Sequence, residues 1–451
     1  MTVGVVSLGC SKNRVDTELM LGILTQAGYE ITGDEARAEI LIVNTCGFIE
    51  SAKQESIDTI LALAEYKQTG RLKLLVVTGC LAQRYEKSLL EEMPEIDLLL
   101  GVSQYPALPG AIERALRGER ASYCQTSEVV LSGERVLTTV PYTAYVRIAD
   151  GCDNCCAYCA IPLIRGRFRS RSMSGVLEEI RTLAGQGVKE HILVAQDTSR
   201  FGVDIAGHSL LPELMVQAAE IPGVEWLRVL YCYPDQVDER LLEAMALKPN
   251  ICKYLDLPLQ HADPEILRRM NRRGDMKDIK RLLLKARDMG FTLRTTFITG
   301  FPGETPKQFE TLMDFAQEVR FDRMGTFAYS AEEDTLAAEM PDQVPEEIRT
   351  KRMERLMLLQ QEISLERNRL RVGTTERMLV EVLRDDGTAV GRSAAEAPEI
   401  DGLILTKPLA NLVNKGVAGS MATGIEGVEI GEFVNVRITD AEPYDLWGVI
   451  E

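Results

Sequence analysis

Four of the ten cysteines lie within eight residues, in the stretch "ADGCDNCCAYCAIP" (residues 149–162). Cys152, Cys156 and Cys159 have the spacing C-x3-C-x2-C, directly after an apolar run that predicts a strand. Thiolates this close together suit zinc or an iron–sulfur cluster. Cys155 leaves two alternatives open: a C-x2-C-x3-C set that uses it in place of Cys156, or a zinc site built from C-x2-C pairs.

Three further cysteines, Cys10, Cys46 and Cys80, each end an apolar run: "VGVVSLGC", "EILIVNTC" and "LKLLVVTGC". In an open parallel α/β sheet, ligands bind outside the carboxyl ends of the strands. The alternative is that these cysteines are small buried hydrophobic residues. Polar or turn residues follow each of them, which favours a second metal site at one sheet edge.

The residues around Cys10, Cys46 and Cys80 have the pattern of an α/β protein. In residues 1–120, apolar runs alternate with helical patterns such as "RVDTELMLGILTQAG", as in an open parallel α/β sheet. Residues 121–140 break this alternation and are expected to be a linker. We therefore predict that residues 1–120 form an N-terminal α/β domain.

A second α/β series begins at residue 141. Six predicted strands separated by helix-length segments indicate a partial (β/α)6 TIM-like barrel over residues 141–370, closed by a long charged helix at about 345–370. Residues 371–451 contain short alternating strands and Gly-rich turns, which predict a small OB-like β-barrel. The Gly-rich segment 411–431 has no assigned role.

Composition limits the class of protein. The formal net charge is −17, which argues against reliance on a phosphate backbone and suits a basic partner. We find neither a signal peptide nor a run of about 18 apolar residues, and ten cysteines in 451 residues are too few for a disulfide scaffold. We expect a cytoplasmic protein without a membrane partner, and nothing indicates an obligate oligomer, so we expect a monomer.

The C-x3-C-x2-C loop after the first barrel strand resembles the signature of radical S-adenosylmethionine (SAM) enzymes. The resemblance implies that Cys152, Cys156 and Cys159 hold a 4Fe–4S cluster, that SAM binds its open iron, and that Cys155 is not a ligand. An upstream three-cysteine domain, a radical SAM core and a terminal barrel together resemble the methylthiotransferases. That family implies a second, auxiliary 4Fe–4S cluster on the upstream cysteines and a terminal TRAM domain for substrate recognition.

Several stretches resemble the protein-modifying branch of this family, which methylthiolates the β-carbon of an aspartate in the twelfth small-subunit ribosomal protein. They are "SLGCSKNRVDTE", "AQDTSRFG", "FITGFPGET", "YSAEEDTLAAEMPDQVPEE" and "AEPYDLWG". Residues 371–451 carry seven Lys and Arg against fourteen Asp and Glu, which fits a basic protein better than tRNA. The alternatives are a tRNA-adenosine methylthiotransferase and, in another class, a non-catalytic zinc-stabilised RNA-binding adaptor.

The resemblance also implies a mechanism. One electron from the core cluster cleaves SAM to methionine and a 5′-deoxyadenosyl radical, and this radical removes hydrogen from the β-carbon. The auxiliary cluster provides sulfur, and a second SAM provides the methyl group. The basic small-subunit ribosomal protein, free or on the ribosome, is the expected substrate. A protein such as flavodoxin or ferredoxin is the expected electron donor.

Other candidates follow from position, because the carboxyl ends of barrel strands face the active site. The alternative is that they cap helices or brace loops. Alternate residues of "IRGRFRSR", beginning at Arg165, are arginine; they form either an exposed basic edge or a contact with the cofactor or the N-terminal domain. The pocket candidates are Tyr158, Arg169, Gln196, Asp197, Arg228, Tyr231, Gln260, His261, Thr299 and Gly300.

Overall fold

A computed structural model describes residues 1–125, 130–407 and 428–451. Most of the Gly-rich segment 411–431 lies outside the described residues. The chain divides into two compact units. Unit 1 comprises Met1–Ile180, Ile192–Leu210 and Ser330–Met340, and unit 2 comprises Arg181–His191, Leu211–Tyr329 and Pro341–Glu451. The domain limits predicted from the sequence do not coincide with the limits of these units, and they stay predictions.

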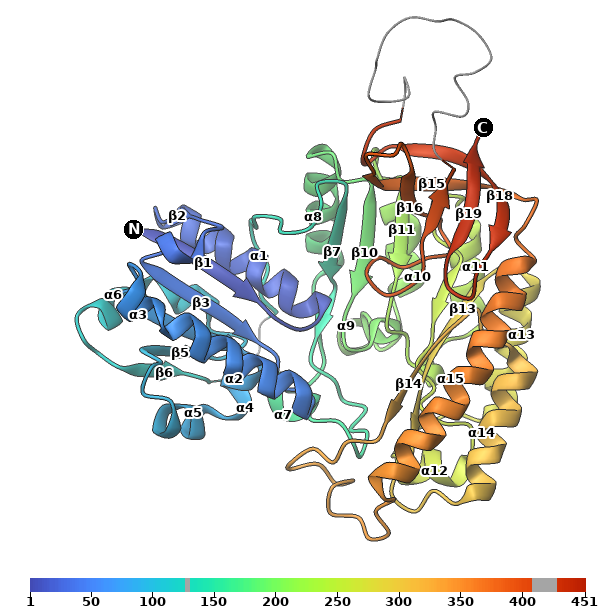
Figure 1. Ribbon diagram of the computed structural model, residues 1–451, viewed down its shortest axis with the longest axis horizontal. Coiled ribbons are helices and arrows are strands. Elements are labelled where there is room, and N and C mark those ends of the chain that lie inside the picture. Colours follow the sequence, from blue (N-terminus) through green and yellow to red (C-terminus); the bar gives the residue numbers. More distant parts are fainter. Residues whose placement is uncertain (126–129, 408–427) are drawn as a thin grey trace, which may run out of the picture. The chain divides into compact units, whose positions relative to one another are not determined.

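A six-stranded sheet forms the N-terminal part of unit 1 (Figure 1). Its order is β2-β1-β3-β4-β5-β6, and every neighbouring pair is parallel. The apolar runs are continuous because helices cover both faces. The strands are β1 (Thr2–Ser7), β2 (Glu30–Ile31), β3 (Ile40–Thr45), β4 (Leu74–Gly79), β5 (Leu98–Leu100) and β6 (Ala121–Tyr123).

Alternate residues of β3 enter different cores. Leu41 and Val43 pack with residues of α2 and α5 on one face, whereas Ile40 and Ile42 pack with residues of α1 and α6 on the other. This part of the chain contains α1 (Ser11–Gln26), η1 (Glu35–Arg37), α2 (Glu50–Ala64), α3 (Tyr66–Thr69), α4 (Cys80–Arg84), α5 (Glu86–Glu92), η2 (Tyr105–Ala107) and α6 (Leu108–Leu116).

The predicted linker is more ordered than its composition indicated. Its first residues, Ala121–Tyr123, form the edge strand β6 beside β5. Further along, the amide of Val136 donates to the carbonyl of Glu18 at 3.1 Å, and that of Thr138 donates to the Glu18 carboxylate at 2.9 Å. This segment therefore packs along α1.

The remaining elements of unit 1 carry the second cysteine loop. Strand β8 pairs with β9 in antiparallel fashion, and β7 belongs to a three-stranded sheet of order β11-β10-β7. The elements are β7 (Thr143–Arg147), β8 (Ala149–Asp150), α7 (Ile161–Arg165), β9 (Arg169–Ser170), α8 (Met173–Gly185), β10 (Glu190–Val194), η3 (Thr198–Arg200) and α9 (Val203–Ala206). The division between the units passes through α8 and β10.

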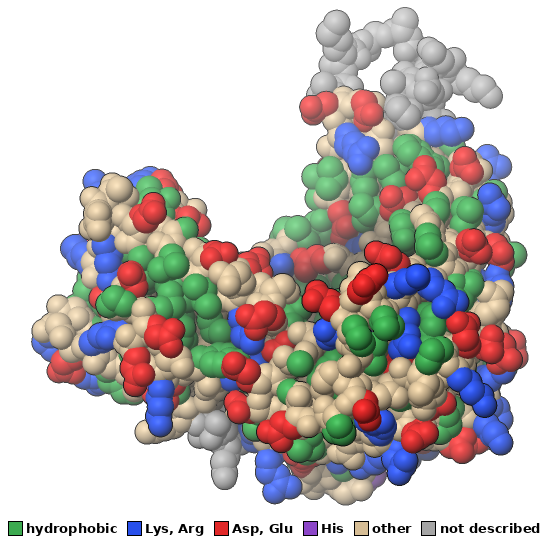
Figure 2. All heavy atoms as spheres, turned by 60° about the horizontal axis from the view of Figure 1, so that its bottom comes forward, with side chains coloured by type: hydrophobic (Ala, Val, Ile, Leu, Met, Phe, Trp, Pro, Cys, Tyr) green, Lys and Arg blue, Asp and Glu red, His purple; other side chains and the backbone are tan. Residues whose placement is uncertain are grey.

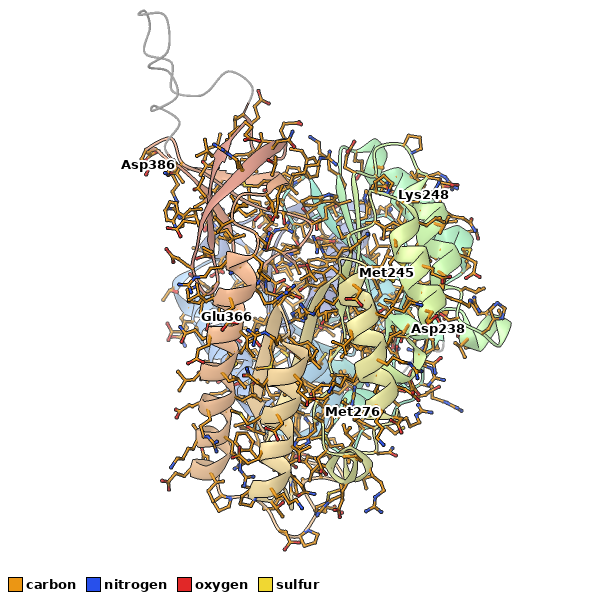
Figure 3. All side chains as sticks on the ribbon, turned by 90° about the vertical axis from the view of Figure 1, so that its right-hand side faces the viewer. Asp238, Met245, Lys248, Met276, Glu366 and Asp386 are labelled. Carbon is orange, nitrogen blue, oxygen red and sulfur yellow. The ribbon has the colours of Figure 1, made fainter. Side chains whose placement is uncertain are left out.

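Unit 2 contains a second parallel sheet of order β12-β13-β14, with the helices α13, α14 and α15 beside it (Figure 1). Figure 3 faces this helix layer and shows Asp238 and Lys248 at opposite ends of α11. The Asp238 carboxylate caps α11 by accepting from the amide of Leu241. The elements are α10 (Leu211–Ala219), β11 (Trp226–Val229), η4 (Pro234–Gln236), α11 (Glu239–Leu247), β12 (Tyr254–Asp256), α12 (Pro264–Arg269), α13 (Met276–Asp288), β13 (Thr292–Thr299), α14 (Pro306–Val319), β14 (Arg323–Ala328) and α15 (Glu346–Arg369).

The C-terminal strands close a barrel of order β15-β16-β17-β19-β18. Four of its strand pairs are antiparallel, and β17 with β19 is parallel. An apolar core fills it, with Met378, Val436 and Leu446 among its buried members. The strands are β15 (Thr375–Leu383), β16 (Ala389–Arg392), β17 (Ile404–Thr406), β18 (Phe433–Ala441) and β19 (Leu446–Ile450). The expected α/β class with a small terminal β-barrel is confirmed.

Acidic and basic side chains are interspersed on the face shown in Figure 2. Interspersed charges of both signs and a net charge of −17 both favour a hydrated surface. Within the described residues, no helix has both the length and the apolar content needed to cross a bilayer.

Candidate functional site

The three upstream cysteines lie at one edge of the six-stranded sheet. Cys10 follows β1 and precedes α1, Cys46 directly follows β3, and Cys80 directly follows β4 as the first residue of α4. These strands are parallel neighbours, so their carboxyl ends meet. A Cβ atom on Gly9 would lie 3.3 Å from Cys46 Sγ, which shows how closely the first two loops approach. The predicted juxtaposition is present.

The three thiols also interact electrostatically. Burial raises the pKa of Cys80 to about 12, and the thiolates of Cys10 and Cys46 add to this rise while Arg165 opposes it. Burial likewise raises the pKa of Cys46. Cys10 differs: burial acts to raise its pKa, but the charges of Lys12 and Arg165 lower it below the usual thiol value. A cationic ligand would relieve the repulsion among all three thiolates.

The second cysteine set occupies a loop held by its own backbone. The amide of Cys152 donates to Gly166 O at 3.1 Å, and that of Cys159 donates to Cys156 O at 3.0 Å. Gly151 has φ +78, and a Cβ there would lie 2.1 Å from Arg167 O, so only glycine fits. Cys155 is exposed and has φ 49, a left-handed conformation.

Gln196 and Asp197 both form hydrogen bonds with the segment around this loop. Gln196 Nε2 donates to Asp150 Oδ1 at 3.0 Å, two residues before Cys152. Asp197 is 1% exposed and accepts from Asn154 Nδ2 at 2.8 Å and from Ser199 Oγ at 2.6 Å. Both candidates therefore brace the cysteine loop, the alternative that the sequence left open. Tyr158 is half-buried within the same loop.

The four arginines of "IRGRFRSR" do not share one environment: some are exposed and others are buried in contacts. Arg167 is exposed, with a side chain 91% accessible. Arg169 is directed to the backbone and donates to Arg167 O at 2.8 Å and Arg165 O at 3.0 Å. Arg171 is buried against Glu179. Arg165 reaches the N-terminal sheet edge, so contact with the N-terminal domain is confirmed for that residue alone.

Arg165 lies at the centre of a buried charge network. Its Nη2 donates to Asp16 Oδ2 at 2.7 Å and to Asn13 Oδ1 at 2.9 Å, and lies 3.8 Å from Cys80 Sγ. Asp16 also accepts a hydrogen bond from Arg147. Asp150 lies 3.4 Å from Arg165 Nη1; burial acts to raise its pKa, but Arg165 and Arg147 together lower it. The two arginines thus favour the charged form of the buried Asp150 carboxylate.

The other candidates belong to unit 2. Arg228 is fully buried; its Nε donates to Glu190 Oε1 at 3.0 Å and its Nη1 donates to Ala394 O at 3.0 Å. Glu190 also binds Arg392 of β16. These contacts give Arg228 a role in holding the C-terminal barrel.

Two candidates have left-handed backbone conformations. Tyr231 has φ 65 and its amide donates to Asp256 Oδ2 at 2.8 Å. Gln260 has φ 72 and its amide donates to Thr296 O at 2.8 Å. Such strained residues cluster at functional sites, so both positions stay candidates.

The "GFPGET" stretch forms a tight buried loop. Glu304 accepts from the amide of Gly300 at 2.6 Å and from Arg352 Nη1 at 2.8 Å. His261 is fully buried, and its Nε2 lies 3.7 Å from Glu304 Oε2. The hydroxyl of Thr299 donates to Arg349 O at 3.1 Å. This loop is anchored on α15.

The main residues missed from the sequence are Asn13, Asp16 and Asp150 in unit 1, and Glu304 with Arg352 in unit 2. Asn13 and Asp16 lie within "SKNRVDTE", where polar residues in the first turns of a buried helix are the one available signal. Their arginine partners, Arg165 and Arg147, lie more than a hundred residues away, so spacing alone does not reveal these contacts.

The cysteines fit a polynuclear iron–sulfur group. All ten are free of disulfide bonds. Among residues 1–125, 130–407 and 428–451, no three His, Cys, Asp or Glu side chains gather closely enough for a single metal ion. The fit to a larger group therefore rests on the facing, mutually interacting thiols of Cys10, Cys46 and Cys80, and on the loop that carries Cys152, Cys156 and Cys159.

Three family descriptions match successive parts of the chain. "Uncharacterized protein family UPF0004" matches residues 2–101, the radical SAM superfamily matches residues 146–316, and the TRAM domain matches residues 372–450. In solved structures, the chain resembles the radical SAM methyltransferase TsrM of Kitasatospora setae with cobalamin and a 4Fe–4S cluster bound. The TM-score is 0.55 at 16% identity, covering 91% of this chain and 82% of TsrM. The fold is thus that of radical SAM enzymes.

Curated relatives define the family more narrowly. Proteins named "Ribosomal protein uS12 methylthiotransferase RimO" are 48% identical in Heliobacterium modesticaldum, covering 99% of this chain and 95% of the relative. The identity is 49% in Pelotomaculum thermopropionicum and 44% in Clostridioides difficile, each covering 99% of this chain and 98% of the relative. The chain is an enzyme of the radical SAM methylthiotransferase class. Within that class it belongs to the RimO family.

Proposed function

We propose that this enzyme transfers a methylthio group to the β-carbon of an aspartate in ribosomal protein uS12. One observation carries the proposal: the two cysteine sets lie in a single compact unit, and Arg165, six residues after Cys159, contacts Cys80. Family membership gives the substrate class. A ribosomal substrate makes the cytoplasm the expected compartment.

The thiolates of Cys152, Cys156 and Cys159 would hold one 4Fe–4S cluster, and those of Cys10, Cys46 and Cys80 a second. When bound, these groups and SAM supply the radical that activates an unreactive carbon, and the sulfur and methyl that are transferred. The chain itself would position these groups. Gln196 and Asp197 bind the segment that carries Cys152, Cys156 and Cys159, and the buried pair of Asp16 and Arg165 lies beside Cys80 of the upstream set.

The C-terminal residues give the observation that bears on the substrate. The acidic composition of residues 371–451 supports a basic protein substrate rather than tRNA. A small soluble electron carrier, such as flavodoxin or ferredoxin, would reduce the first cluster. We expect the enzyme to act as a monomer.

The test is complementation with mass readout. The gene is expressed in a bacterium that lacks its own methylthiotransferases, and ribosomal proteins and tRNA nucleosides are both analysed by mass spectrometry. We expect a methylthio mass increment on one aspartate of uS12 and unmodified tRNA, with Cys156→Ala as the inactive control. Methylthio-adenosine in tRNA with unmodified uS12 would move the enzyme to the tRNA branch.

A further inference from the structure

Arg165 has the position of a link between the two cysteine sets. It ends the short helix α7, which begins two residues after Cys159, and its side chain is 1% exposed. Its Nη2 faces three acceptors: Asp16, Asn13 and the sulfur of Cys80. With only two N–H bonds on Nη2, the contact to Cys80 Sγ shares a proton. A sulfur that carries more negative charge would take a larger share.

Asn13 connects this guanidinium to the other upstream cysteines. Its Nδ2 donates to Leu8 O at 3.1 Å and to Thr45 O at 3.0 Å. Leu8 lies two residues before Cys10, and Thr45 directly precedes Cys46. Asn13 Oδ1 accepts from Arg165 and lies 3.5 Å from Cys80 Sγ. One asparagine, held by one arginine, thus ties together the chain segments next to all three cysteines.

We propose that Arg165 is a positioning residue for a cluster on Cys10, Cys46 and Cys80, and that its buried N–H donors and charge raise that cluster's reduction potential. The inference rests on the proposed function. Hydrogen bonds to cluster sulfurs and nearby positive charge stabilise the reduced, more negative state. Burial strengthens this effect, because little solvent screens the charge.

The charge of Arg165 is matched within its surroundings, so the residue is built into the fold. Asp16 and Asp150 balance Arg165 and Arg147. Arg147 binds Asp16. Arg165 alone in this group reaches both the carboxylates and a cysteine sulfur. Arg165, which follows the loop of Cys152, Cys156 and Cys159, would thereby adjust the reduction potential of a cluster held by the upstream cysteines.

The experiment uses the full chain with Cys152, Cys156 and Cys159 replaced by alanine, so that only the upstream set can hold a cluster. After anaerobic reconstitution, the midpoint potential is measured by redox titration followed by electron paramagnetic resonance. Arg165→Gln and Arg165→Lys are compared with Arg171→Gln, a buried arginine of the same run that binds Glu179. We expect a more negative midpoint and altered g values for Arg165→Gln, a smaller shift for Arg165→Lys, and the parent value for Arg171→Gln.

Each outcome decides the matter. An unchanged midpoint and spectrum in both Arg165 variants would overturn the inference while the upstream cluster stands. If Arg165→Gln does not fold, Arg165→Lys still tests the inference, because it keeps the charge beside Asp16 and changes the donors. A parent protein without iron would refute the upstream cluster itself, and the inference with it.

Discussion

Glu190 Oε2 accepts a hydrogen bond of 2.7 Å from Arg392 Nη2, which joins the start of β10 to the end of β16 in the C-terminal barrel. Both side chains are buried, and Arg228 donates to the same carboxylate at 3.0 Å. Arg392 Nε additionally donates to Glu381 at 2.8 Å. Two buried guanidinium groups thus share one fully buried carboxylate as an ion-pair partner.

Glu190→Gln should strongly destabilise unit 2. The change leaves the buried charges of Arg228 and Arg392 without their shared partner, and removing one member of such a pair costs about 3–5 kcal/mol. Thermal unfolding followed by calorimetry measures the loss. The control is Glu225→Gln, whose exposed pair with Arg377 should contribute no more than about 1 kcal/mol. Equal shifts in both variants would contradict the role given to Glu190.

The same carboxylate predicts a pH dependence. Burial acts to raise the pKa of Glu190, but Arg392 and Arg228 outweigh it and lower the pKa to about 2. A depressed folded-state pKa contributes stability above the unfolded value of about 4.3, and that stability is lost as pH falls from about 5 toward 2. The stability difference between the native protein and Glu190→Gln should therefore shrink over this range. Denaturant unfolding at pH 7, 5 and 3.5 measures it, and a constant difference would contradict the assignment.

Gly300 is constrained by its neighbour as well as by its backbone. With φ +71, a Cβ at this position would lie 2.1 Å from Arg349 Cγ and 3.0 Å from Arg349 Cα, so α15 would have to move. Gly290 has φ +84 and open space around it, so Gly290→Ala should show strain alone, roughly 1–2 kcal/mol. Gly300→Ala should lower the melting temperature more than Gly290→Ala. Equal melting temperatures would show that α15 moves to accept the added Cβ without a loss of stability.

Glu332 anchors the segment Ser330–Met340 within unit 1. Its Oε2 lies 3.4 Å from both Lys53 Nζ and Arg84 Nη1, and Ser330 Oγ donates to its Oε1 at 3.0 Å. The same segment reaches the cysteine loop, where the amide of Ala337 donates to Ala157 O at 2.8 Å. Lys53 and Arg84 belong to α2 and α4, so this segment touches structure beside both cysteine sets.

Glu332→Gln should loosen this segment, because the buried Arg84 loses its carboxylate partner and Lys53 keeps only Glu50. Hydrogen–deuterium exchange read by mass spectrometry should show faster exchange across 330–340 and at the Ala157 loop. Glu339→Gln, at an exposed position of the same segment, is the matched control and should exchange as the native protein does. Unaltered exchange in the Glu332 variant would mean that backbone contacts alone hold the segment.

The sequence predicted those features that local pattern determines. Apolar runs ending in Cys10, Cys46 and Cys80 indicated parallel strands, and parallel strands bring their carboxyl ends together. A position at the end of a strand predicted active-site residues less well, because it does not determine the direction in which the side chain points. Arg228 was expected in the active-site pocket, yet its contacts are to Glu190 and to Ala394, 166 residues further along the chain. Contacts this distant leave no trace in spacing.

Either Cys155 or Cys156 could be the third cluster ligand beside Cys152 and Cys159. Both spacings are compatible with thiolate ligation, and only family resemblance selected Cys156. The structure adds a difference: Cys155 is exposed with φ 49, whereas Cys156 is partly buried and interacts with Cys152. Neighbouring thiolates that repel one another are those that a shared cation would stabilise.

Cys155→Ala should therefore retain the iron content and visible absorption of the native protein after anaerobic reconstitution, whereas Cys156→Ala should lose about half of both, the share expected of one of two equal clusters. The two variants remove the same thiol group at adjacent positions, so each controls for the other. Iron is measured by colorimetric assay, and SAM cleavage by chromatography of 5′-deoxyadenosine. Loss of iron in Cys155→Ala with retention in Cys156→Ala would assign the ligand set to Cys152, Cys155 and Cys159, and the family spacing would not apply to this loop.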